Sequence, residues 1–485
     1  MEFYFHWGFW LAALQVLIIC GVTLRVIFTR HPPGASFAWI LITTIIPFAG
    51  FILYIMFGER PIGRIRAWRY RRLIESFRLK DKEAKNQELG HLPAPVKPYQ
   101  SMIRLAKSCS FSPVTHGNNL TLLSSPEASF ASMVDAINTA QKTIDMAFYI
   151  WAEGGMANNV RDALLQARSR NVLVRILVDD FASRKFLESE TAKVFREAGI
   201  EVSNAMPMKL LRIFGLQRAD LRLHRKLVVI DNRVAFTGSL NMIDPSTYEA
   251  AKRVGDWVDA MVKIEGPAVH PLENLFLTDW MLQPDHQLGC RVDPPPENLD
   301  QPGEGIVISV PSGPNTPQDP NLHLLLEAIN QARESIVLTT PYFVPNEVLI
   351  TSLLNALYRG ASVKIIIPER EDNRMVTWAS RRYFDDLLSA GAEILLYRDG
   401  LLHTKSLSVD HQFTVFGTVN FDNRSMHLNY ELMLLIFDQP FIDDIYELLA
   451  SYESQCDRVI LAQWRQRPWR ERLLEGACFL LSPLL

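Results

Sequence analysis

An internal repeat constrains the fold of this chain more than any other feature. Each half contains a histidine, a lysine two residues later and an aspartate five residues after the lysine, in the pattern H-x-K-x4-D. In both copies a glycine follows the histidine by 14 residues and an asparagine by 17. The two triplets are His224, Lys226 and Asp231, and His403, Lys405 and Asp410. Two copies in the same register predict two domains of the same fold.

A strand, a helix and a second strand precede each copy of the motif. In the first half, residues 144–151 (IDMAFYIW) and 172–178 (VLVRILV) predict strands, and residues 158–170 between them have helical spacing. The same order recurs at residues 336–343, 346–359 and 363–367. A helix between two buried strands is typical of a parallel pair. We therefore predict an α/β protein with two similar domains, each a mixed β-sheet flanked by helices.

The repeated residue types suit a phosphodiester. Residues two apart on a strand share a face, so each histidine lies beside its lysine, and the returning strand adds a hydroxyl and an amide. An imidazole can act as nucleophile or acid, and an ammonium and an amide can bind the non-bridging oxygens. The expected phosphate-binding residues are Asn241, Asn420, Ser239 and Thr418. Asp231 and Asp410 precede turns, where stabilising the turn is a more natural role than proton transfer.

The first sixty residues predict a membrane anchor. Residues 7–27 carry no charge before Arg25, and residues 37–57 carry none. Each run has about 20 residues, enough to cross a bilayer as a helix. The proline-containing connection at residues 29–34 favours a tight reversal, so we predict a transmembrane hairpin of two helices. A cleaved signal peptide is the alternative for the first run, but a second apolar run follows without a cleavage pattern.

A basic segment follows this anchor. Residues 59–80 contain eight Lys or Arg against two Glu, an excess of 8 − 2 = +6, while the whole chain has a net charge of −3. Such a flank predicts a cytoplasmic position and favours contact with anionic lipid heads. The rest of the chain then sums to −3 − 6 = −9, which argues against nucleic acid as a partner.

Composition predicts the remaining boundaries. Proline-containing residues 87–112 are interpreted as a linker, and residues 294–320, rich in Pro, Asp, Asn and Gly, as the seam between the domains. Arginines and large apolar residues alternate in the tail, which predicts either an interfacial membrane helix or a helix docked on the domain. The predicted parts are the hairpin at 1–58, the basic segment and linker at 59–112, domain one at 113–300, domain two at 301–455 and the amphipathic tail at 456–485.

Cysteines and the other histidines indicate no metal site. The five cysteines are scattered, which fits a reducing cytoplasm better than a disulfide framework. The remaining histidines do not have metal-ligand spacing, and the lysines supply the positive charge that a divalent ion provides elsewhere. We predict no metal and no other cofactor.

The two motifs resemble those of the phospholipase D superfamily, whose members carry paired HKD motifs. Within it, the chain is similar to the bacterial cardiolipin synthases over nearly its whole length. The similarity rests on the runs AWI and YIMFG in the hairpin, on HRKLVVIDNRVAFTGSLNM from His224, on GTVNFDNRS from Gly417 and on the terminal SPLL. The chain does not depart from the family pattern at the HKD positions.

This resemblance implies that both half-sites meet in one active site. His224 would attack phosphorus, and His403 would protonate the leaving alcohol and later act as base. The implied reaction transfers a phosphatidyl group between two phosphatidylglycerol molecules, releases glycerol and passes through a phosphohistidine. The resemblance gives the catalytic set as His224, Lys226, Asp231, His403, Lys405 and Asp410. It also implies the bacterial cytoplasmic (inner) membrane, with several spans and with the catalytic domains facing the cytoplasm.

If His224 attacks while His403 donates a proton, the two imidazoles need opposite protonation states and therefore different environments. Each imidazole is therefore expected to have an orienting carboxylate. Glu431, which precedes an apolar run, is the candidate in the second half, and Asp259 holds the comparable place in the first. The offsets from the histidine differ, 28 against 35 residues, which leaves Asp256 as a rival.

Other functions stay open at this point. A hydrolase of the phospholipase D type, or a transferase using another alcohol, fits the same motif. A lipid-binding membrane scaffold is the non-enzymatic alternative, but it has no need for two matched His-Lys-Asn sets. The sequence does not predict the oligomeric state.

Overall fold

The computed structural model describes residues 2–29, 33–59, 66–70, 72, 94–110, 112–207, 218, 220–248, 251–283, 300–314, 316 and 319–480. The chain divides into two compact units. One consists of Met1–Trp68 and Met208–Leu221, and the other of Arg69–Pro207 and Arg222–Leu485.

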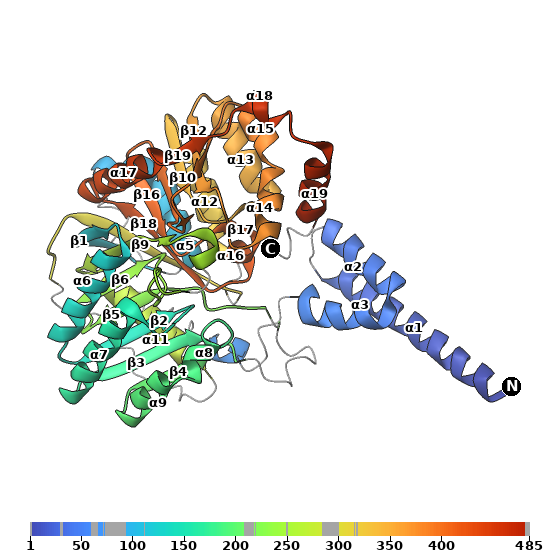
Figure 1. The fold of residues 1–485 in the computed structure, drawn as a ribbon, viewed down its shortest axis with the longest axis horizontal. Helices are drawn as coiled ribbons and strands as arrows, with labels where there is room; N and C mark the ends of the chain where they lie inside the picture. Colours follow the sequence, from blue (N-terminus) through green and yellow to red (C-terminus); the bar gives the residue numbers. More distant parts are fainter. Residues whose placement is uncertain are drawn as a thin grey trace. The chain divides into compact units, whose positions relative to one another are not determined.

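The first unit contains one long apolar helix, α1 (Glu2–Phe28), drawn in dark blue in Figure 1. Its 21 residues Gly8–Phe28 have a mean hydropathy of 2.3. At about 1.5 Å per residue they extend about 30 Å, the thickness of a bilayer's hydrocarbon core. Within the described residues, this helix alone is long and apolar enough to cross a membrane.

The second apolar run is broken into shorter helices, so the predicted hairpin of two membrane-spanning helices is supported only in part. It forms α2 (Pro33–Ile45), α3 (Pro47–Leu53) and a π-helical turn, η1 (Tyr54–Gly58). Pro47 has no N–H to continue α2 and begins α3 instead. The chain bends so sharply here that a Cβ on Gly50 would lie 2.8 Å from the Thr43 Cα.

The end of this broken segment is tied to the end of α1. The Arg25 guanidinium donates two hydrogen bonds to Glu59, at 2.6 and 2.8 Å, and the Tyr54 hydroxyl donates one at 2.9 Å. Tyr54 also packs against Val22 and Val26 of α1. Residues 33–59 therefore return to the end of α1 from which they depart.

The second unit is built on one mixed sheet of 15 strands, which contains both halves of the repeat. Its order is β19-β13-β12-β10-β15-β16-β18-β9-β1-β8-β6-β5-β2-β3-β4. The first half supplies β1 (Val114–Leu123), β2 (Thr143–Phe148), β3 (Leu173–Asp179), β4 (Glu201–Ala205), β5 (Leu227–Ile230), β6 (Val234–Gly238) and β8 (Met261–Glu265). The second supplies β9 (Gly305–Ser312), β10 (Ser335–Thr339), β12 (Ser362–Pro368), β13 (Glu393–Tyr397), β15 (Ser406–Val409), β16 (Phe413–Gly417), β18 (Glu431–Phe437) and β19 (Cys456–Arg458).

The two halves mirror each other about the antiparallel pair of β1 and β9. Outward from this pair, the first half runs β8, β6, β5, β2, β3, β4, and the second runs β18, β16, β15, β10, β12, β13. The strands β2, β3 and β4 are parallel, as are β10, β12 and β13, and the remaining main-sheet pairs are antiparallel. The predicted α/β fold with two similar halves is confirmed.

Two predicted connecting segments contain regular structure. Strand β9 lies inside the predicted seam at 294–320, because its apolar run Gly305–Ser312 pairs with both β1 and β18. The predicted linker at 87–112 contains η3 (Ala94–Tyr99) and α5 (Gln100–Ser110). Met102, Ile103 and Ala106 bury one face of α5 in the core of the second half. Residues 87–93 and 111 of the predicted linker, and most of the basic segment, lie outside the described residues.

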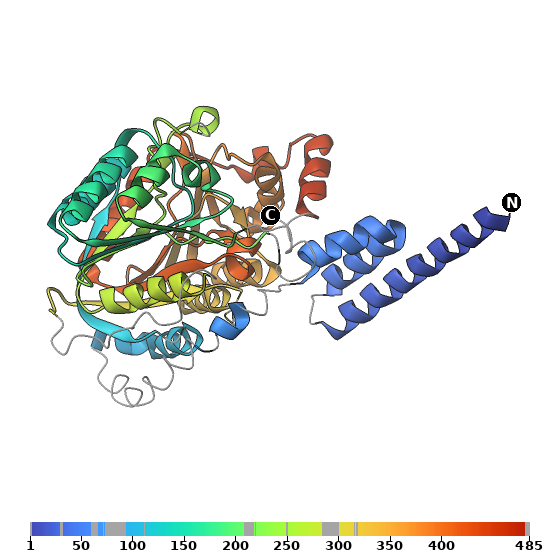
Figure 2. The same cartoon turned by 90° about the horizontal axis from the view of Figure 1, so that it is seen from below.

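Helices cover both faces of the sheet. In the first half, α6 (Pro126–Thr139) and α7 (Gly155–Ser169) pack on Ile144, Met146 and Phe148 of β2, and α11 (Val269–Met281) packs on the other face (Figures 1 and 2). The shorter helices of this half are α8 (Arg184–Leu187), α9 (Glu190–Glu197) and α10 (Ala251–Val254).

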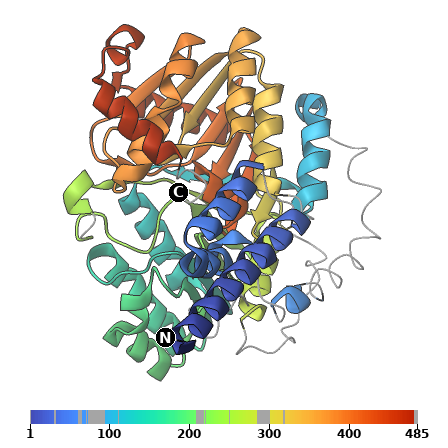
Figure 3. The ribbon, with the colours of Figure 1, turned by 90° about the vertical axis from the view of Figure 1, so that its right-hand side faces the viewer.

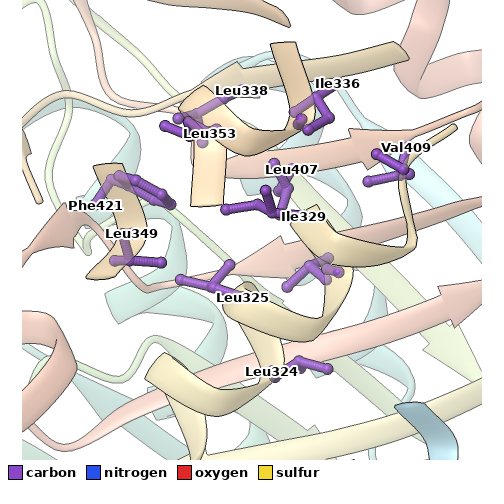
Figure 4. Packing of buried hydrophobic residues seen from close by; sticks show 14 of the residues in the cluster. Leu324, Leu325, Ile329, Ile336, Leu338, Leu349, Leu353, Leu407, Val409 and Phe421 are labelled. Carbon is purple, nitrogen blue, oxygen red and sulfur yellow. The ribbon is translucent and has the colours of Figure 1, made fainter. Parts of the chain in front are cut away.

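The second half follows the same plan. Helix α12 (Pro320–Gln331) places Leu325 and Ile329 in a core with Leu338 of β10 and Leu407 of β15, as Figure 4 shows. The other helices are α13 (Glu347–Tyr358), α14 (Arg374–Arg381), α15 (Phe384–Ser389), α16 (Asn423–His427), α17 (Gln439–Glu453), α18 (Leu461–Trp464) and α19 (Trp469–Phe479). The last two, red in Figure 3, lie on the surface of this half.

Candidate active site

Both histidines lie where the two halves of the repeat exchange backbone hydrogen bonds. His224 precedes β5, and its N–H donates to the Tyr430 carbonyl of the second half at 2.9 Å. His403 precedes β15, and its N–H donates to the Val258 carbonyl of the first half at 2.9 Å. Two short parallel strands, β7 (Trp257–Val258) and β14 (Leu401–Leu402), reinforce the second contact. The halves therefore hold one another together at the two motifs.

Each imidazole is paired with a carboxylate from the opposite half. His224 Nδ1 lies 2.9 Å from Glu431 Oε2, and His403 Nδ1 lies 2.6 Å from Asp259 Oδ1. Both carboxylates are fully buried. Asp259 and Glu431 were predicted to orient the histidines, but the predicted assignment by half is wrong because the pairs cross. The rival Asp256 contributes its backbone carbonyl, which accepts from the Leu401 N–H.

Ser239 and Thr418, predicted to bind phosphate, hold these carboxylates instead. The Ser239 hydroxyl donates to Asp259 Oδ1 at 2.6 Å and accepts from the Ala260 N–H. The Thr418 hydroxyl donates to Glu431 Oε2 at 2.5 Å and accepts from the Leu432 N–H. Each hydroxyl proton is thus already used within the protein. Ser239 and Thr418 follow the strands that return beside each motif. At these positions their hydroxyls face the carboxylates and not the phosphate site.

The two lysines bring positive charge to the same buried place. Lys226 Nζ donates to the His224 carbonyl at 2.9 Å, and Lys405 Nζ donates to the His403 carbonyl at 2.5 Å. Burial lowers the pKa of Lys226 to about 8. Burial, and next the charge of Lys226, hold the pKa of Lys405 well below its usual range. Two lysines whose positive charges repel one another form a site suited to an anion.

Both imidazoles are neutral in the substrate-free protein at pH 7. Burial lowers the pKa of His224 to about 4, and the charge of Glu431 opposes this shift. Burial, and next the charge of Lys405, lower the pKa of His403 to about 3. A phosphodiester anion between the lysines would favour protonation of a neighbouring imidazole, because an opposite charge stabilises the charged form. Substrate binding can therefore favour the protonated imidazole that serves as proton donor.

We expect nitrogen NMR of labelled histidines to show both imidazoles neutral at pH 6 without substrate. With a pKa of about 4, only about 1% of His224 is protonated at that pH, whereas about 75% of an unperturbed imidazole with a pKa of about 6.5 would be. Inorganic phosphate should raise the pKa of at least one of the two. The exposed His411 is the internal control for an accessible histidine. A protonated His224 or His403 at pH 6 in the anion-free protein would contradict this electrostatic picture.

The two motif asparagines and the two motif aspartates have different environments. Asn241 Oδ1 accepts from the Ile150 N–H at 3.2 Å, and Asn420 Oδ1 is buried with no hydrogen-bond partner in the described part of the chain. Asp231 accepts three backbone N–H bonds of 2.7–2.8 Å from residues 141–143, and Asp410 accepts three of 2.7–2.8 Å from residues 333–335. These aspartates anchor turns, in accordance with the structural interpretation of their position.

Aromatic rings and one arginine complete the site, and the sequence analysis did not single them out. The Tyr149 ring lies 5.0 Å from the His224 ring, and the Trp257 ring lies 4.6 Å from the His403 ring. The buried Arg225 donates to the carbonyls of Glu431, at 2.9 Å, and Ser312, at 2.8 Å, and pairs with Asp279. The available signal was position, since Tyr149 directly follows the apolar strand β2 and Arg225 lies between His224 and Lys226.

The arrangement fits nucleophilic displacement at a phosphodiester. Two carboxylate-bound imidazoles can serve as nucleophile and as acid or base, and two lysines can stabilise charge on the non-bridging oxygens. Within the described residues, no group of three or more His, Cys, Asp or Glu side chains could hold a metal ion. The absence of a metal requirement stays a prediction.

The mirrored α/β halves and the crossed site define a phospholipase D-like protein. The family model described as "Cardiolipin synthase, PLD-like domain" matches residues 133–280 and 325–452, and a phospholipase D-nuclease N-terminal model matches residues 16–59. The chain belongs to this cardiolipin synthase family.

Individual relatives agree with this family assignment. The chain is 37% identical to cardiolipin synthase A of Proteus mirabilis, over all of this chain and 98% of that relative. It is 38% identical to cardiolipin synthase A of a Klebsiella pneumoniae strain, over 99% and 97% of the two chains. A phosphatidylserine synthase structure from Haemophilus influenzae superposes with a TM-score of 0.57 at 15% identity, over 79% of this chain and all of that one, and supports the fold.

Proposed function

We propose that this protein is a cardiolipin synthase that transfers a phosphatidyl group from one phosphatidylglycerol to another and releases glycerol. The observation that carries the proposal is the crossed pairing, which assembles two His-Lys sets from both halves of the repeat into one buried site. The full-length similarity to proteins named cardiolipin synthase A supports the choice of reaction.

In the first step, His224 Nε2 attacks the phosphorus of the donor lipid. The bond from phosphorus to the glycerol oxygen breaks, and His403 gives its proton to that oxygen. The product is a phosphatidyl group on His224, whose ring becomes cationic and remains hydrogen-bonded to Glu431 through Nδ1. Lys226 and Lys405 stabilise charge on the non-bridging oxygens, and Asn241 and Asn420 orient the phosphate.

The second step runs the first in reverse with a different alcohol. His403, now neutral, takes a proton from a hydroxyl of the second phosphatidylglycerol, and the oxygen attacks phosphorus. The bond between phosphorus and His224 breaks, so His224 returns to its neutral form and cardiolipin leaves. Asp259 keeps His403 in one orientation for both proton transfers.

One assay tests the proposed reaction. Purified protein is incubated with phosphatidylglycerol labelled in its headgroup and in its acyl chains, and the lipid and water-soluble products are resolved. We expect equal amounts of cardiolipin and free glycerol. Phosphatidic acid as the main lipid product would identify a hydrolase, and no conversion at all would favour a lipid-binding scaffold.

The crossed carboxylates predict different defects for two near-isosteric variants. Glu431→Gln should slow attack by His224 by about 100-fold or more, with phosphatidylglycerol and with a p-nitrophenyl phosphodiester alike. Asp259→Asn disturbs His403, so it should slow the reaction of phosphatidylglycerol but leave the first release of p-nitrophenolate nearly normal, since this leaving group needs no proton. Rapid-mixing measurement of that release separates the two. The opposite pattern would mean that the pairs do not cross during catalysis.

We also infer that the catalytic unit faces the cytoplasm at the inner membrane. Helix α1 is long enough to span a bilayer. Residues 33–59 return to Arg25, so Arg25 and Glu59, where the basic segment begins, lie at the same end of this helix. By the positive-inside rule that end is cytoplasmic. Protease accessibility of the catalytic unit in inverted membrane vesicles, but not in right-side-out spheroplasts, tests this orientation.

A further inference from the structure

Helix α19 packs one of its faces against the protein. On the inner face, Cys478 is buried with Val344 and with the α14 residues Val376 and Ala379. The Phe479 ring lies 5.5 Å from the Tyr383 ring. The tail is therefore docked on the second half, as one of its two predicted arrangements required (Figures 1 and 3).

Outside this packed face, α19 and its C-cap residue carry large apolar side chains that lie in the open. Trp469, Leu473 and Leu480 expose 69%, 65% and 78% of their surface. Because successive helical residues turn by about 100°, these three positions fall within an arc of about 40° and form one ridge. The exposed Arg470 and Arg472 lie on opposite sides of this ridge. We call Trp469, Leu473 and Leu480 the outer ridge.

A ridge of this kind is costly in water. Each large side chain loses hydrophobic free energy by staying exposed, and contiguous apolar patches rimmed by polar groups mark contact surfaces. A tryptophan, two leucines and flanking arginines are the composition of helices that lie in the plane of a membrane interface. There the ring and the leucines enter the acyl boundary, while the arginines extend to the headgroup phosphates.

We propose that the outer ridge of α19 docks the catalytic half onto the anionic lipid surface of the membrane. A lipid partner fits better than a second protein because the arginines on both sides of the ridge complement anionic headgroups. Helix α1 also keeps the chain at a bilayer. This inference goes beyond the proposed function, since the docking would hold for any acceptor alcohol.

The docked helix is connected to the active site through two short strands. Val344, which packs on Cys478, belongs to β11 (Phe343–Val344), and β11 pairs in parallel with β17 (Phe421–Asp422). Strand β17 directly follows Asn420 of the second motif. Helix α19 is therefore linked through two short strands to a residue proposed to orient the phosphate.

Fluorescence quenching in proteoliposomes tests the docking without turnover. The full-length protein is compared with Trp469→Phe in vesicles of phosphatidylcholine and phosphatidylserine with brominated acyl chains. We expect brominated lipid to quench at least about half of the emission that Trp469→Phe removes, and aqueous iodide to quench little of it. A smaller anionic fraction should weaken the lipid quenching, because the arginines then have fewer partners.

A matched control places a tryptophan elsewhere on the same unit. Tyr358, 73% exposed, ends α13, which follows β11 and leads to the start of β12. In the Trp469→Phe background, Tyr358→Trp should be quenched by iodide and not by brominated lipid. Iodide quenching of Trp469 equal to that of the control would overturn the proposal. So would protection of Trp469 that depends on protein concentration in lipid-free detergent, which would identify a second copy as the partner.

The activity test uses a substrate in two physical states. Leu473→Glu should lower kcat/KM about tenfold for phosphatidylglycerol in vesicles and change it less than about twofold for a short-chain phosphatidylglycerol below its micellar concentration. Tyr358→Glu should change neither. An equal loss on both substrates, or no loss on vesicles, would exclude the docking role. Failure of cardiolipin synthesis in the wild-type protein would contradict the proposed function and leave the quenching test valid.

Discussion

Replacing His224 with alanine is expected to lower turnover of phosphatidylglycerol by at least about 10⁴-fold, and replacing His403 with alanine by about 10²–10⁴-fold. The loss is larger for His224 because the proposed covalent step has no other nucleophile. Both variants should still fold. Glu431 retains hydrogen bonds from Thr418, Ser425 and Asn429, and Asp259 retains one from Ser239.

The measurement is conversion of labelled phosphatidylglycerol at equal amounts of membrane-inserted protein, with thermal unfolding as the check on the fold. His411→Ala is the matched control. His411 is exposed and bonded to Asp443, so its loss should leave the rate within about twofold of the wild type. Near-normal activity in either catalytic variant would exclude the model of two cooperating half-sites.

The repeat was predictable because the sequence of each half contains the same order of strand, helix and strand before its motif. The apolar strand of residues 144–151, the helix after it and the next strand recur in the same order before His403, and the sheet shows them at mirrored positions. His224 and Lys226 were predicted to lie at one site because they are two residues apart in the sequence. These are local patterns, and the local spacing of a strand determines which residues share a face.

The crossing of the carboxylates was not predictable from local patterns. The offsets of Glu431 and Asp259 were measured within each half, whereas the hydrogen bonds run between halves. A spacing along the chain carries no information about which of two similar domains supplies a partner. The role of Arg225 was not predicted for the same reason, because its three partners come from β18, β9 and α11.

The predictions for residues 87–112 and 37–57 were less accurate because they relied on composition and not on the positions of individual residues. Three prolines led to the interpretation of residues 87–112 as a linker, although the spacing of Met102, Ile103 and Ala106 is that of a helix with one buried face. The apolar composition of residues 37–57 predicted a continuous span, although Pro47 stands in its middle and ends the first of two short helices.

The proposed intermediate is expected on His224 and not on His403. A phosphorylated imidazole carries a fixed positive charge until the second alcohol attacks, so it benefits from a carboxylate that stays ionised. Glu431 accepts from His224 and from three other donors. Burial raises its pKa, but a positive charge on the His224 ring, such as the intermediate carries, the hydrogen bonds from His224 and Thr418 and the charge of Lys226 bring that pKa below the usual range. Asp259 has a buried Oδ2 with no hydrogen-bond partner among the described residues.

The His403→Asn variant should make this intermediate accumulate. It lacks the proton donor of the first step, which a p-nitrophenyl phosphodiester does not need, and the base of the second step, which every alcohol acceptor needs. With that substrate we expect a burst of p-nitrophenolate of about one equivalent per active site, followed by turnover at least about 100-fold slower than in the wild type. The adduct is then located by peptide mass spectrometry after a quench that avoids acid, because phosphohistidine hydrolyses in acid.

His224→Ala with the same substrate is the matched control and should give neither burst nor adduct. An adduct on His403 of the wild-type protein would reverse the two roles, and the Glu431 and Asp259 variants would then have to exchange their defects as well. A burst with the adduct on neither histidine would place the covalent bond on another residue. Steady turnover of His403→Asn without any burst would mean that the acceptor displaces the leaving group directly, and the mirrored half-sites would then bind the phosphate without sharing a covalent step.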